Sequence, residues 1–225
     1  MAGQLGVGWT NDRVDAARDT AAARADKPLP AGRVTRRTLT IAAALALAAC
    51  VVLSLALGLV PGSLHLVAVA AALAYNFGLK AGPLSPLPYL VSFGLLPVVV
   101  STAGAGMPLP PAGVVAAAAL LGVAAHFANT VPDSTADAAT GVRGLPQRLG
   151  PAASLAVAAA LVCLAAGTLL AGAPHRGAGP VGLLVAGAAL SAIGVPLAAR
   201  ASRRGVFGLT LVAVALVIAG FLTAA

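Results

Sequence analysis

The chain has 225 residues, of which 60% are hydrophobic and 9% are charged, and its formal net charge is +8. A soluble domain carries roughly 25% charged residues, so this composition excludes an ordinary water-facing surface and favours one that faces lipid. A pI near 11.1 would also suit a nucleic-acid-binding protein. We exclude nucleic acid as a partner because the basic residues lie in short segments between apolar runs.

Seven apolar runs follow one another along the chain. A helix needs about 20 residues to cross the hydrocarbon core, with a range of roughly 17–25. The runs therefore predict an all-α, multi-spanning transmembrane helical bundle that forms one domain over residues 1–225. Ala and Gly dominate the runs, which favours close helix contacts in lipid. The runs cover residues 39–60, 63–79, 87–104, 112–128, 152–173, 179–199 and 205–223.

The basic residues are distributed very unevenly among the segments that connect these runs. Thirteen of the fourteen Lys and Arg residues lie in segments 1–38, 80–86, 129–151 and 200–204, and the fourteenth is Arg176. Seven spans place those four segments on one side of the membrane. Because Lys and Arg accumulate on the cytoplasmic side, we expect a multi-pass plasma-membrane protein with these segments in the cytoplasm.

The acidic residues form two clusters. The chain has no Glu and only six Asp, all within two of the four basic segments. In the first cluster, N-D-R-V-D-A-A-R-D, residues Asn11, Asp15 and Asp19 are spaced i, i+4, i+8 and share one face of a helix. The second cluster, N-T-V-P-D-S-T-A-D (residues 129–137), repeats this spacing, although Pro132 interrupts a continuous helix.

Carboxylates four residues apart repel one another on a helix, so two such rows near a membrane favour a bound cation. Hard oxygen ligands suit Mg²⁺, which binds one or two carboxylates together with substrate phosphates. Carboxylates with nearby cations indicate a site for a metal–diphosphate complex. The alternative is a solvated surface on which Asp residues balance Arg residues. The basic residues are Arg24 and Lys27 after the first cluster, and Arg143 and Arg148 after the second.

Three segments carry a family resemblance. Residues 11–32, N-D-R-V-D-A-A-R-D followed by R-A-D-K-P-L-P-A-G, resemble the first aspartate-rich motif of the UbiA-type superfamily of intramembrane prenyltransferases. Residues 129–150, which end in G-V-R-G-L-P-Q-R-L-G, resemble the second motif of that superfamily. The segment Y-N-F-G-L-K, residues 75–80, resembles its Tyr/Lys element. The three segments follow the family's order, and the resemblance extends over essentially the whole chain.

The resemblance implies a bundle with a cavity that opens to cytoplasm and lipid. It also implies transfer of a prenyl group from a polyprenyl diphosphate to an apolar or aromatic acceptor within the membrane, with Mg²⁺ as the cofactor. By position, the magnesium ligands and catalytic carboxylates are Asp15, Asp19, Asp133 and Asp137, supported by Asn11, Asp12 and Asn129 as further metal ligands. The diphosphate-binding residues are Arg24, Lys27, Lys80 and Arg143, assisted by Tyr75.

The chain also departs from the family pattern. Family members have nine spans, whereas seven are expected here, and only ten residues precede Asn11. The resemblance therefore predicts that the first span and most of the second are missing. A misassigned start codon, a fragment and a naturally shortened protein are the three explanations, and we favour the first. A shortened chain could lack a cavity wall and be inactive.

Two other functions compete with the prenyltransferase. One is an ion-coupled membrane transporter, and the other is a catalytically inactive membrane subunit. Transporters place ionisable groups near the bilayer midplane, whereas these Asp residues lie at the ends of spans, which favours the enzyme. His126 either contacts the acceptor or packs within its helix, and Asp26 is expected to be an ion-pair partner in a loop. The sequence leaves open the acceptor, the prenyl length and the oligomeric state.

Overall fold

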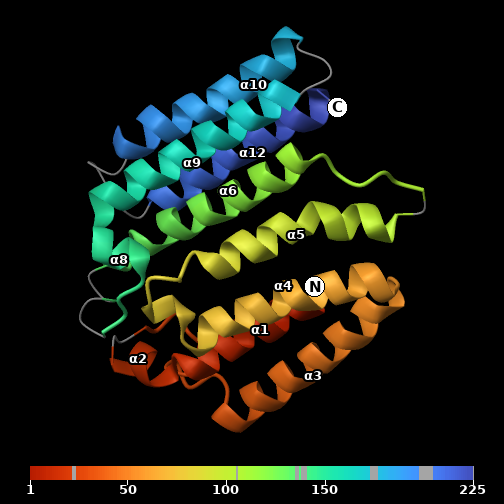
Figure 1. Ribbon diagram of the computed structural model, residues 1–225. Helices are drawn as coiled ribbons and strands as arrows, with labels where there is room; N and C mark the ends of the chain where they lie inside the picture. Colours follow the sequence, from red (N-terminus) through yellow and green to blue (C-terminus); the bar gives the residue numbers. More distant parts are fainter. Residues whose placement is uncertain are drawn as a thin grey trace.

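The computed structural model describes residues 1–21, 24–104, 106–134, 137, 141–172, 177–197 and 205–224, and the regular elements in this part of the chain are helices (Figure 1). Six helices are long and apolar enough to span a membrane, and α5 (Leu87–Ala103) is a shorter apolar helix. These helices confirm the predicted all-α, multi-spanning bundle. The six are α3 (Arg36–Ala56), α4 (Leu59–Phe77), α6 (Ala112–Thr130), α9 (Pro151–Gly172), the helical segment Ala178–Leu197 that begins with α10 (Ala178–Ala189), and α12 (Val206–Ala224).

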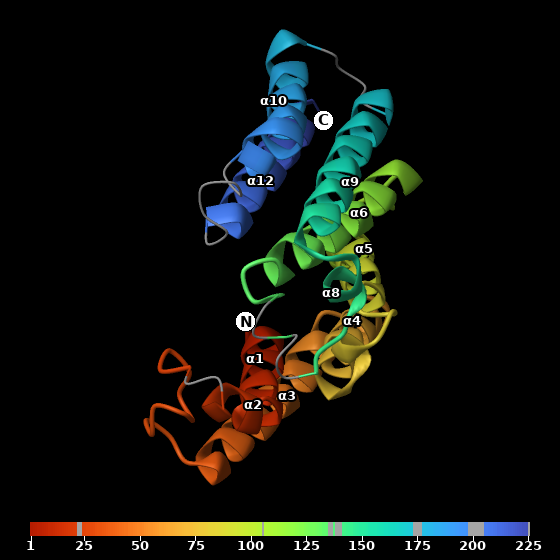
Figure 2. The same ribbon diagram turned by 90° about the vertical axis from the view of Figure 1, so that its left-hand side faces the viewer.

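Helices that are consecutive along the chain pack side by side. The row runs from α3 through α4, α5 and α6 to α9, and α10 packs on α12, which returns to contact α6. Figure 2 shows that this row is curved, so that α10 and α12 at one end project to the same side as the N-terminal helices at the other. The main apolar core lies where α6 and α9 meet, and it includes Ala124, Val162, Leu184 and Val217.

The N-terminal segment differs from the sequence expectation. We expected residues 1–38 to be a polar connecting segment, but Ala2–Val14 forms helix α1, which packs against α3 and α4. A methyl group added to Gly3 would lie 3.0 Å from Cys50 Sγ, so the backbone of α1 packs closely against side chains of α3. Thr10 and Asn11 give this helix little hydropathy, and a search for apolar runs therefore misses it. Its polar groups have partners inside the protein, such as the Thr10 hydroxyl, which donates to the Gly6 carbonyl at 2.7 Å.

Local sequence signals explain several helix boundaries. The Thr35 hydroxyl accepts a hydrogen bond from the Thr38 amide at 3.1 Å and caps the start of α3. Pro88 lies in the first turn of α5, where its missing N–H costs nothing. The π-helical turn η2 (Leu190–Gly194) ends two residues before Pro196, whose nitrogen has no hydrogen to donate to the preceding turn. Proline thus starts one helix and distorts another.

Glycine allows two of the closest helix contacts. A Cβ on Gly62 in α4 would lie 2.4 Å from the Ser54 carbonyl oxygen in α3. A Cβ on Gly187 in α10 would lie 2.7 Å from the Ala213 carbonyl oxygen in α12. In lipid, helices associate through such close packing because no hydrophobic effect drives them together. The Gly- and Ala-rich composition therefore determines how tightly neighbouring helices pack.

The polar motifs all lie at one end of the bundle. Helix α2 (Ala16–Ala21), the short helix η1 (Leu79–Ala81) and helix α8 (Leu145–Leu149) lie together at that end (Figure 1). These elements carry or adjoin both Asp clusters and the Tyr/Lys segment. Four of the basic residues that entered the orientation argument lie outside the described residues: Arg176, Arg200, Arg203 and Arg204.

Candidate functional site

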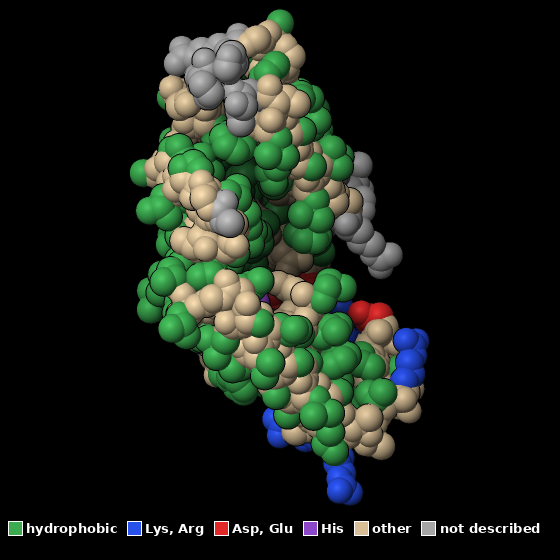
Figure 3. Space-filling model, turned by 90° about the vertical axis from the view of Figure 1, so that its right-hand side faces the viewer, with side chains coloured by type: hydrophobic (Ala, Val, Ile, Leu, Met, Phe, Trp, Pro, Cys, Tyr) green, Lys and Arg blue, Asp and Glu red, His purple; other side chains and the backbone are tan. Residues whose placement is uncertain are grey.

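A cavity of about 530 Å³ opens at this end of the bundle. Viewed from the opposite end, the molecule is hollowed between its N-terminal and C-terminal helices, and acidic side chains are visible in the depth of the hollow (Figure 3). The lining comes from both Asp clusters and from helices α1, α4, α5 and α6. It includes most of the residues expected from the sequence: Asn11, Asp15, Asp19, Arg24, Lys27, Tyr75, Lys80, Asn129, Asp133 and Asp137.

Two expected site residues do not line this cavity. Asp12 is not part of the lining, and its carboxylate accepts a hydrogen bond from Lys27 Nζ at 2.6 Å. Arg143 is exposed, and its carbonyl oxygen accepts a hydrogen bond from Arg148 Nε at 2.8 Å. Asp12 is therefore placed to hold Lys27, and Arg143 would have to turn inward to reach a ligand.

The first row of polar side chains continues across the junction between α1 and α2. The helix ends at Val14, yet the Asp15 amide donates to the Asn11 carbonyl at 2.9 Å and the Asp19 amide donates to the Asp15 carbonyl at 2.8 Å. This unbroken i to i+4 pattern keeps the three side chains on one face. The Asn11 side chain donates to Asn76 Oδ1 at 3.2 Å, so α4 orients the start of the row.

The second row begins where α6 ends. Asp133 and Asp137 lie on the turn that follows Thr130, and the Asp137 amide donates to the Asp133 carbonyl at 2.8 Å. Gln147 in α8 donates from Nε2 to Asp137 Oδ2 at 2.8 Å. Because Gln147 also lines the cavity, it orients one carboxylate from within the site.

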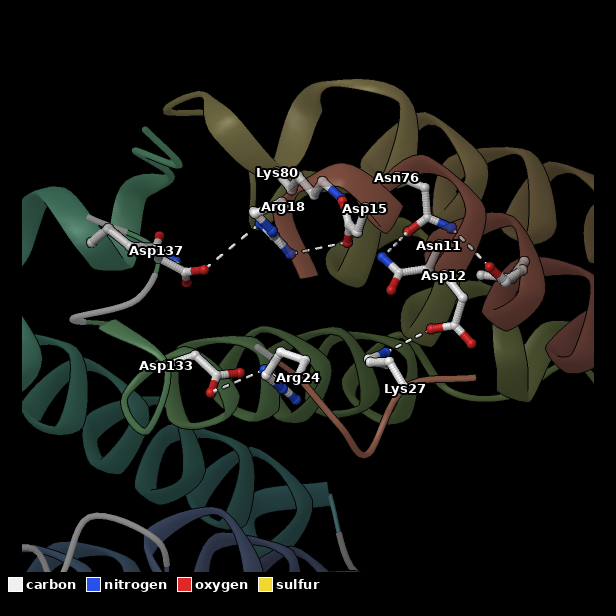
Figure 4. Close-up of polar contacts among 12 residues, drawn as sticks. Asn11, Asp12, Asp15, Arg18, Arg24, Lys27, Asn76, Lys80, Asp133 and Asp137 are labelled. Atoms are coloured by element: carbon white, nitrogen blue, oxygen red, sulfur yellow. Dashed lines mark hydrogen bonds and ion pairs between the residues drawn. The ribbon is translucent and has the colours of Figure 1, made fainter. Parts of the chain in front are cut away.

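Cationic side chains connect the two rows. Lys80 Nζ donates to Asp15 Oδ1. Arg18 Nη2 donates to Asp15 Oδ2 at 3.0 Å, and Arg18 Nη1 lies 3.7 Å from Asp137 Oδ1 (Figure 4). One guanidinium therefore contacts a carboxylate from each row, which shows that the rows face each other across the cavity.

A second set of ion pairs surrounds the loop after α2. Arg24 lies 3.7 Å from Asp133 and 3.0 Å from Asp26, whose side chain is 62% exposed. As expected from the sequence, Asp26 is thus an ion-pair partner in a loop, and its partner is Arg24. The Arg24 contact is a second link between the N-terminal segment and the segment after α6 (Figure 4).

Burial makes some of these carboxylates costly to ionise. Burial raises the pKa of Asp19 above its ordinary value, although the nearby Lys27 acts in the opposite direction. Burial likewise raises the pKa of Asp137, and the hydrogen bond from Gln147 opposes that rise. A further cation in the cavity would favour the charged form of both carboxyl groups.

The donor atoms fit a hard divalent cation. Carboxylate and amide oxygens from both rows line the cavity, and oxygen is the ligand that Mg²⁺ prefers. Asp19 Oδ2 is buried and accepts no hydrogen bond from the part of the chain that the structure describes. The described residues hold no group of three acidic, Cys or His side chains close enough to surround a metal ion.

Ser85 joins the loops that carry these charges. Its hydroxyl oxygen accepts a hydrogen bond from the Leu145 amide at 3.0 Å and lies 3.1 Å from His126 Nε2. His126 is 1% exposed and does not line the cavity, so of the two interpretations the packed histidine fits the structure. The Lys80 loop, α6 and α8 are thus held together at one buried point.

Gly144 lies at the closest approach of these loops, and its replacement tests their importance. A Cβ there would lie 2.6 Å from the Lys80 carbonyl oxygen and 2.9 Å from Ser85 Oγ. We expect Gly144→Ala to destabilise the protein by about 1–3 kcal/mol, measured as a lower thermal unfolding midpoint in detergent. Gly82→Ala, whose Cβ would meet no atom closer than 3.8 Å, is the matched control. Equal midpoints for the two variants would contradict the close-approach argument.

A second, apolar cavity of about 370 Å³ adjoins the first. Its walls come mainly from α6 and α12, with Leu121, Phe207 and Phe221 among the lining residues. Tyr89, Phe93 and Asn129 line both cavities and mark their junction. The site therefore joins a charged mouth to an apolar chamber.

Comparison with known proteins agrees with this arrangement. The model of the UbiA prenyltransferase family matches residues 1–207, which include both Asp rows and the Tyr/Lys segment. The chain belongs to the UbiA prenyltransferase family. No curated protein sequence matches the chain significantly.

Two solved structures share the UbiA-family fold with this chain. The apo structure of a UbiA homolog from Aeropyrum pernix K1 superposes with a TM-score of 0.71 at 24% identity, over 99% of this chain and 85% of that one. A structure of a digeranylgeranylglyceryl phosphate synthase superposes with a TM-score of 0.65 at 20% identity, over 98% of this chain and 81% of that one. At these identities the likeness supports the fold alone.

The motif residues of this UbiA-family protein depend on side chains that our sequence analysis did not identify. Asn76 and Gln147 orient a member of each row, and Arg18 contacts both rows. All three lie within the segments that resemble family motifs, so position within a motif was the available signal. Only the folded chain shows which of their neighbours they contact.

Proposed function

We propose that this protein transfers a prenyl group from a polyprenyl diphosphate to an apolar or aromatic acceptor within the membrane. The observation that carries the proposal is the junction of a charged mouth with an apolar chamber at Tyr89, Phe93 and Asn129. A diphosphate ester of a long hydrocarbon has the same two parts. Its polar group suits the mouth, and its chain suits the chamber.

The residues at the mouth can bind a diphosphate in two ways. Lys80, Arg24 and Lys27 line the cavity and supply positive charge for phosphate oxygens. Asp15, Asp19, Asp133 and Asp137, with Asn11 and Asn129, would supply the oxygen ligands for Mg²⁺, and Asp12 would support them through its contact with Lys27. Bound Mg²⁺ would neutralise charge on the departing diphosphate. Tyr75 and Arg143 remain further candidates for diphosphate binding.

The chamber protects the other product of ionisation. When the carbon–oxygen bond to the diphosphate breaks, the prenyl fragment carries an allylic positive charge. The rings of Tyr89 and Phe93, whose centroids are 6.3 Å apart, lie at the junction, where aromatic faces can stabilise a cation. Apolar walls keep water from the cation until the acceptor reacts with it.

The position of the charged groups argues against the transporter alternative. Asp15, Asp19 and Asp133 lie beyond the apolar helices, at one end of the bundle. Ion-coupled carriers commonly bind ions near the bilayer midplane. By the positive-inside rule, the basic residues of this end support a cytoplasmic location for it, in a multi-pass protein of the plasma membrane.

An assay of diphosphate release tests the proposal. Purified protein in detergent or membranes is incubated with labelled geranylgeranyl diphosphate, Mg²⁺ and a series of aromatic and lipid acceptors. We expect diphosphate release that requires both Mg²⁺ and an acceptor and stops when EDTA is added. If no acceptor supports release above the rate without protein, the alternative of a catalytically inactive membrane subunit would be preferred.

A further inference from the structure

Arg18 occupies the space between the two carboxylate rows. It lies in α2, directly before Asp19, and its side chain is 27% exposed. Nη2 lies 3.0 Å from Asp15 Oδ2 and Nη1 lies 3.7 Å from Asp137 Oδ1 (Figure 4). A planar guanidinium can donate to two carboxylates at once, which a lysine ammonium does less well.

These contacts offset the repulsion between two negative charges. Asp15 and Asp137 come from opposite rows, and both contact the same guanidinium. The side chain of Asp15 is 7% exposed and that of Asp137 is 15% exposed, so water screens them weakly. A cation between them removes most of that repulsion, and in this structure the cation is Arg18.

A divalent metal would use the same oxygens. Asp15 Oδ2 and Asp137 Oδ1 face the cavity and are within reach of Arg18. A metal ion bound to both would place two positive charges next to the guanidinium, and like charges at that distance repel. Arg18 and the metal therefore compete for these two carboxylates.

We propose that Arg18 is an internal countercation, which holds the two rows together in the absence of metal and is displaced when a divalent metal binds Asp15 and Asp137. This inference rests on the proposed function, because it requires the two rows to be metal ligands. Displacement frees the guanidinium at the mouth of the cavity. Metal entry is thereby coupled to the release of a positive group beside the diphosphate site.

Metal binding without any prenyl donor tests the proposal. Mn²⁺ is titrated into the full-length protein in detergent, and free Mn²⁺ is measured by electron paramagnetic resonance. We expect Arg18→Gln to bind Mn²⁺ about tenfold more tightly than wild type, because the competing charge is gone. Arg18→Lys keeps the charge, and its affinity should stay within about threefold of wild type.

Arg13→Gln is the matched control for the loss of a positive charge. Arg13 lies on α1 near the same end, and its Nε donates to the Thr40 hydroxyl at 2.7 Å, away from the cavity. Its Mn²⁺ affinity should equal that of wild type. If Arg13→Gln and Arg18→Gln both gained the same Mn²⁺ affinity, the change in net charge alone would explain the effect. That result would overturn the countercation role.

A stability measurement separates the remaining outcomes. In EDTA, Arg18→Gln should unfold at a lower temperature than Arg13→Gln, and saturating Mn²⁺ should restore most of the difference. Equal Mn²⁺ affinity in wild type and Arg18→Gln would overturn the countercation role and leave the metal site of the proposed function standing. Absence of Mn²⁺ binding in all variants would overturn the metal site, and this inference with it.

Discussion

Replacing Asp15 with Asn should lower the rate of diphosphate release at saturating prenyl donor by at least about 100-fold. Asp15 has two cationic partners, since both Lys80 and Arg18 pair with it. An amide keeps the size of the side chain but removes the negative charge that a metal ligand supplies. It also leaves Lys80 without its anionic partner in a nearly buried position. The initial rate of labelled diphosphate release measures the effect.

Two further variants make this result interpretable. Asp26→Asn removes a carboxylate that is exposed and outside the cavity lining, and its rate should stay within about threefold of wild type. Asp133→Asn changes a half-exposed carboxylate of the second row, so it should fold normally and still lose most of the activity. If Asp15→Asn and Asp133→Asn fold and both release diphosphate at the wild-type rate, the two rows do not form the active site.

Filling the apolar chamber should change which donor the enzyme accepts. Ala118 lines the chamber from α6, on the same face as Leu121 and Ala125. A Phe at position 118 would occupy much of a space of about 370 Å³. We expect Ala118→Phe to lower kcat/KM for geranylgeranyl diphosphate at least about tenfold, because the distal part of the chain loses its site. With geranyl diphosphate, which is two isoprene units shorter, kcat/KM should remain within about threefold of wild type.

The matched control lies two residues away on the same helix. Ala116 is exposed and does not line the chamber, so Ala116→Phe adds the same ring to the outer surface. Its ratio of activities with the two donors should equal that of wild type. An equal loss with both donors in Ala118→Phe would mean that the prenyl chain binds elsewhere.

Much of the fold follows from the sequence alone. Apolar runs of about 20 residues can satisfy their backbone polar groups in lipid only as helices, and for that reason hydropathy predicted the spans within a few residues. It missed α1, because Ala2–Val14 is packed against α3 and α4 but contains Gly, Gln, Thr and Asn. A helix that faces a polar cavity need not be apolar, so hydropathy is the wrong measure for it.

The Asp spacing likewise predicted which side chains share a helix face, because the helical period is local information. Ten of the twelve side chains that sequence reasoning assigned to the site do line one cavity, and Asp12 and Arg143 do not. The sequence by itself therefore determined the class of the protein and the two rows of carboxylates.

Only the tertiary structure decided how those rows meet. The contacts of Arg18 with Asp137, of Asn76 with Asn11 and of Ser85 with Leu145 join residues far apart in the chain. Such contacts depend on how the helices curve and cross, which hydropathy and spacing do not encode. The junction of the charged mouth with the apolar chamber has the same origin, because it forms only when α5, α6 and α12 enclose a common space.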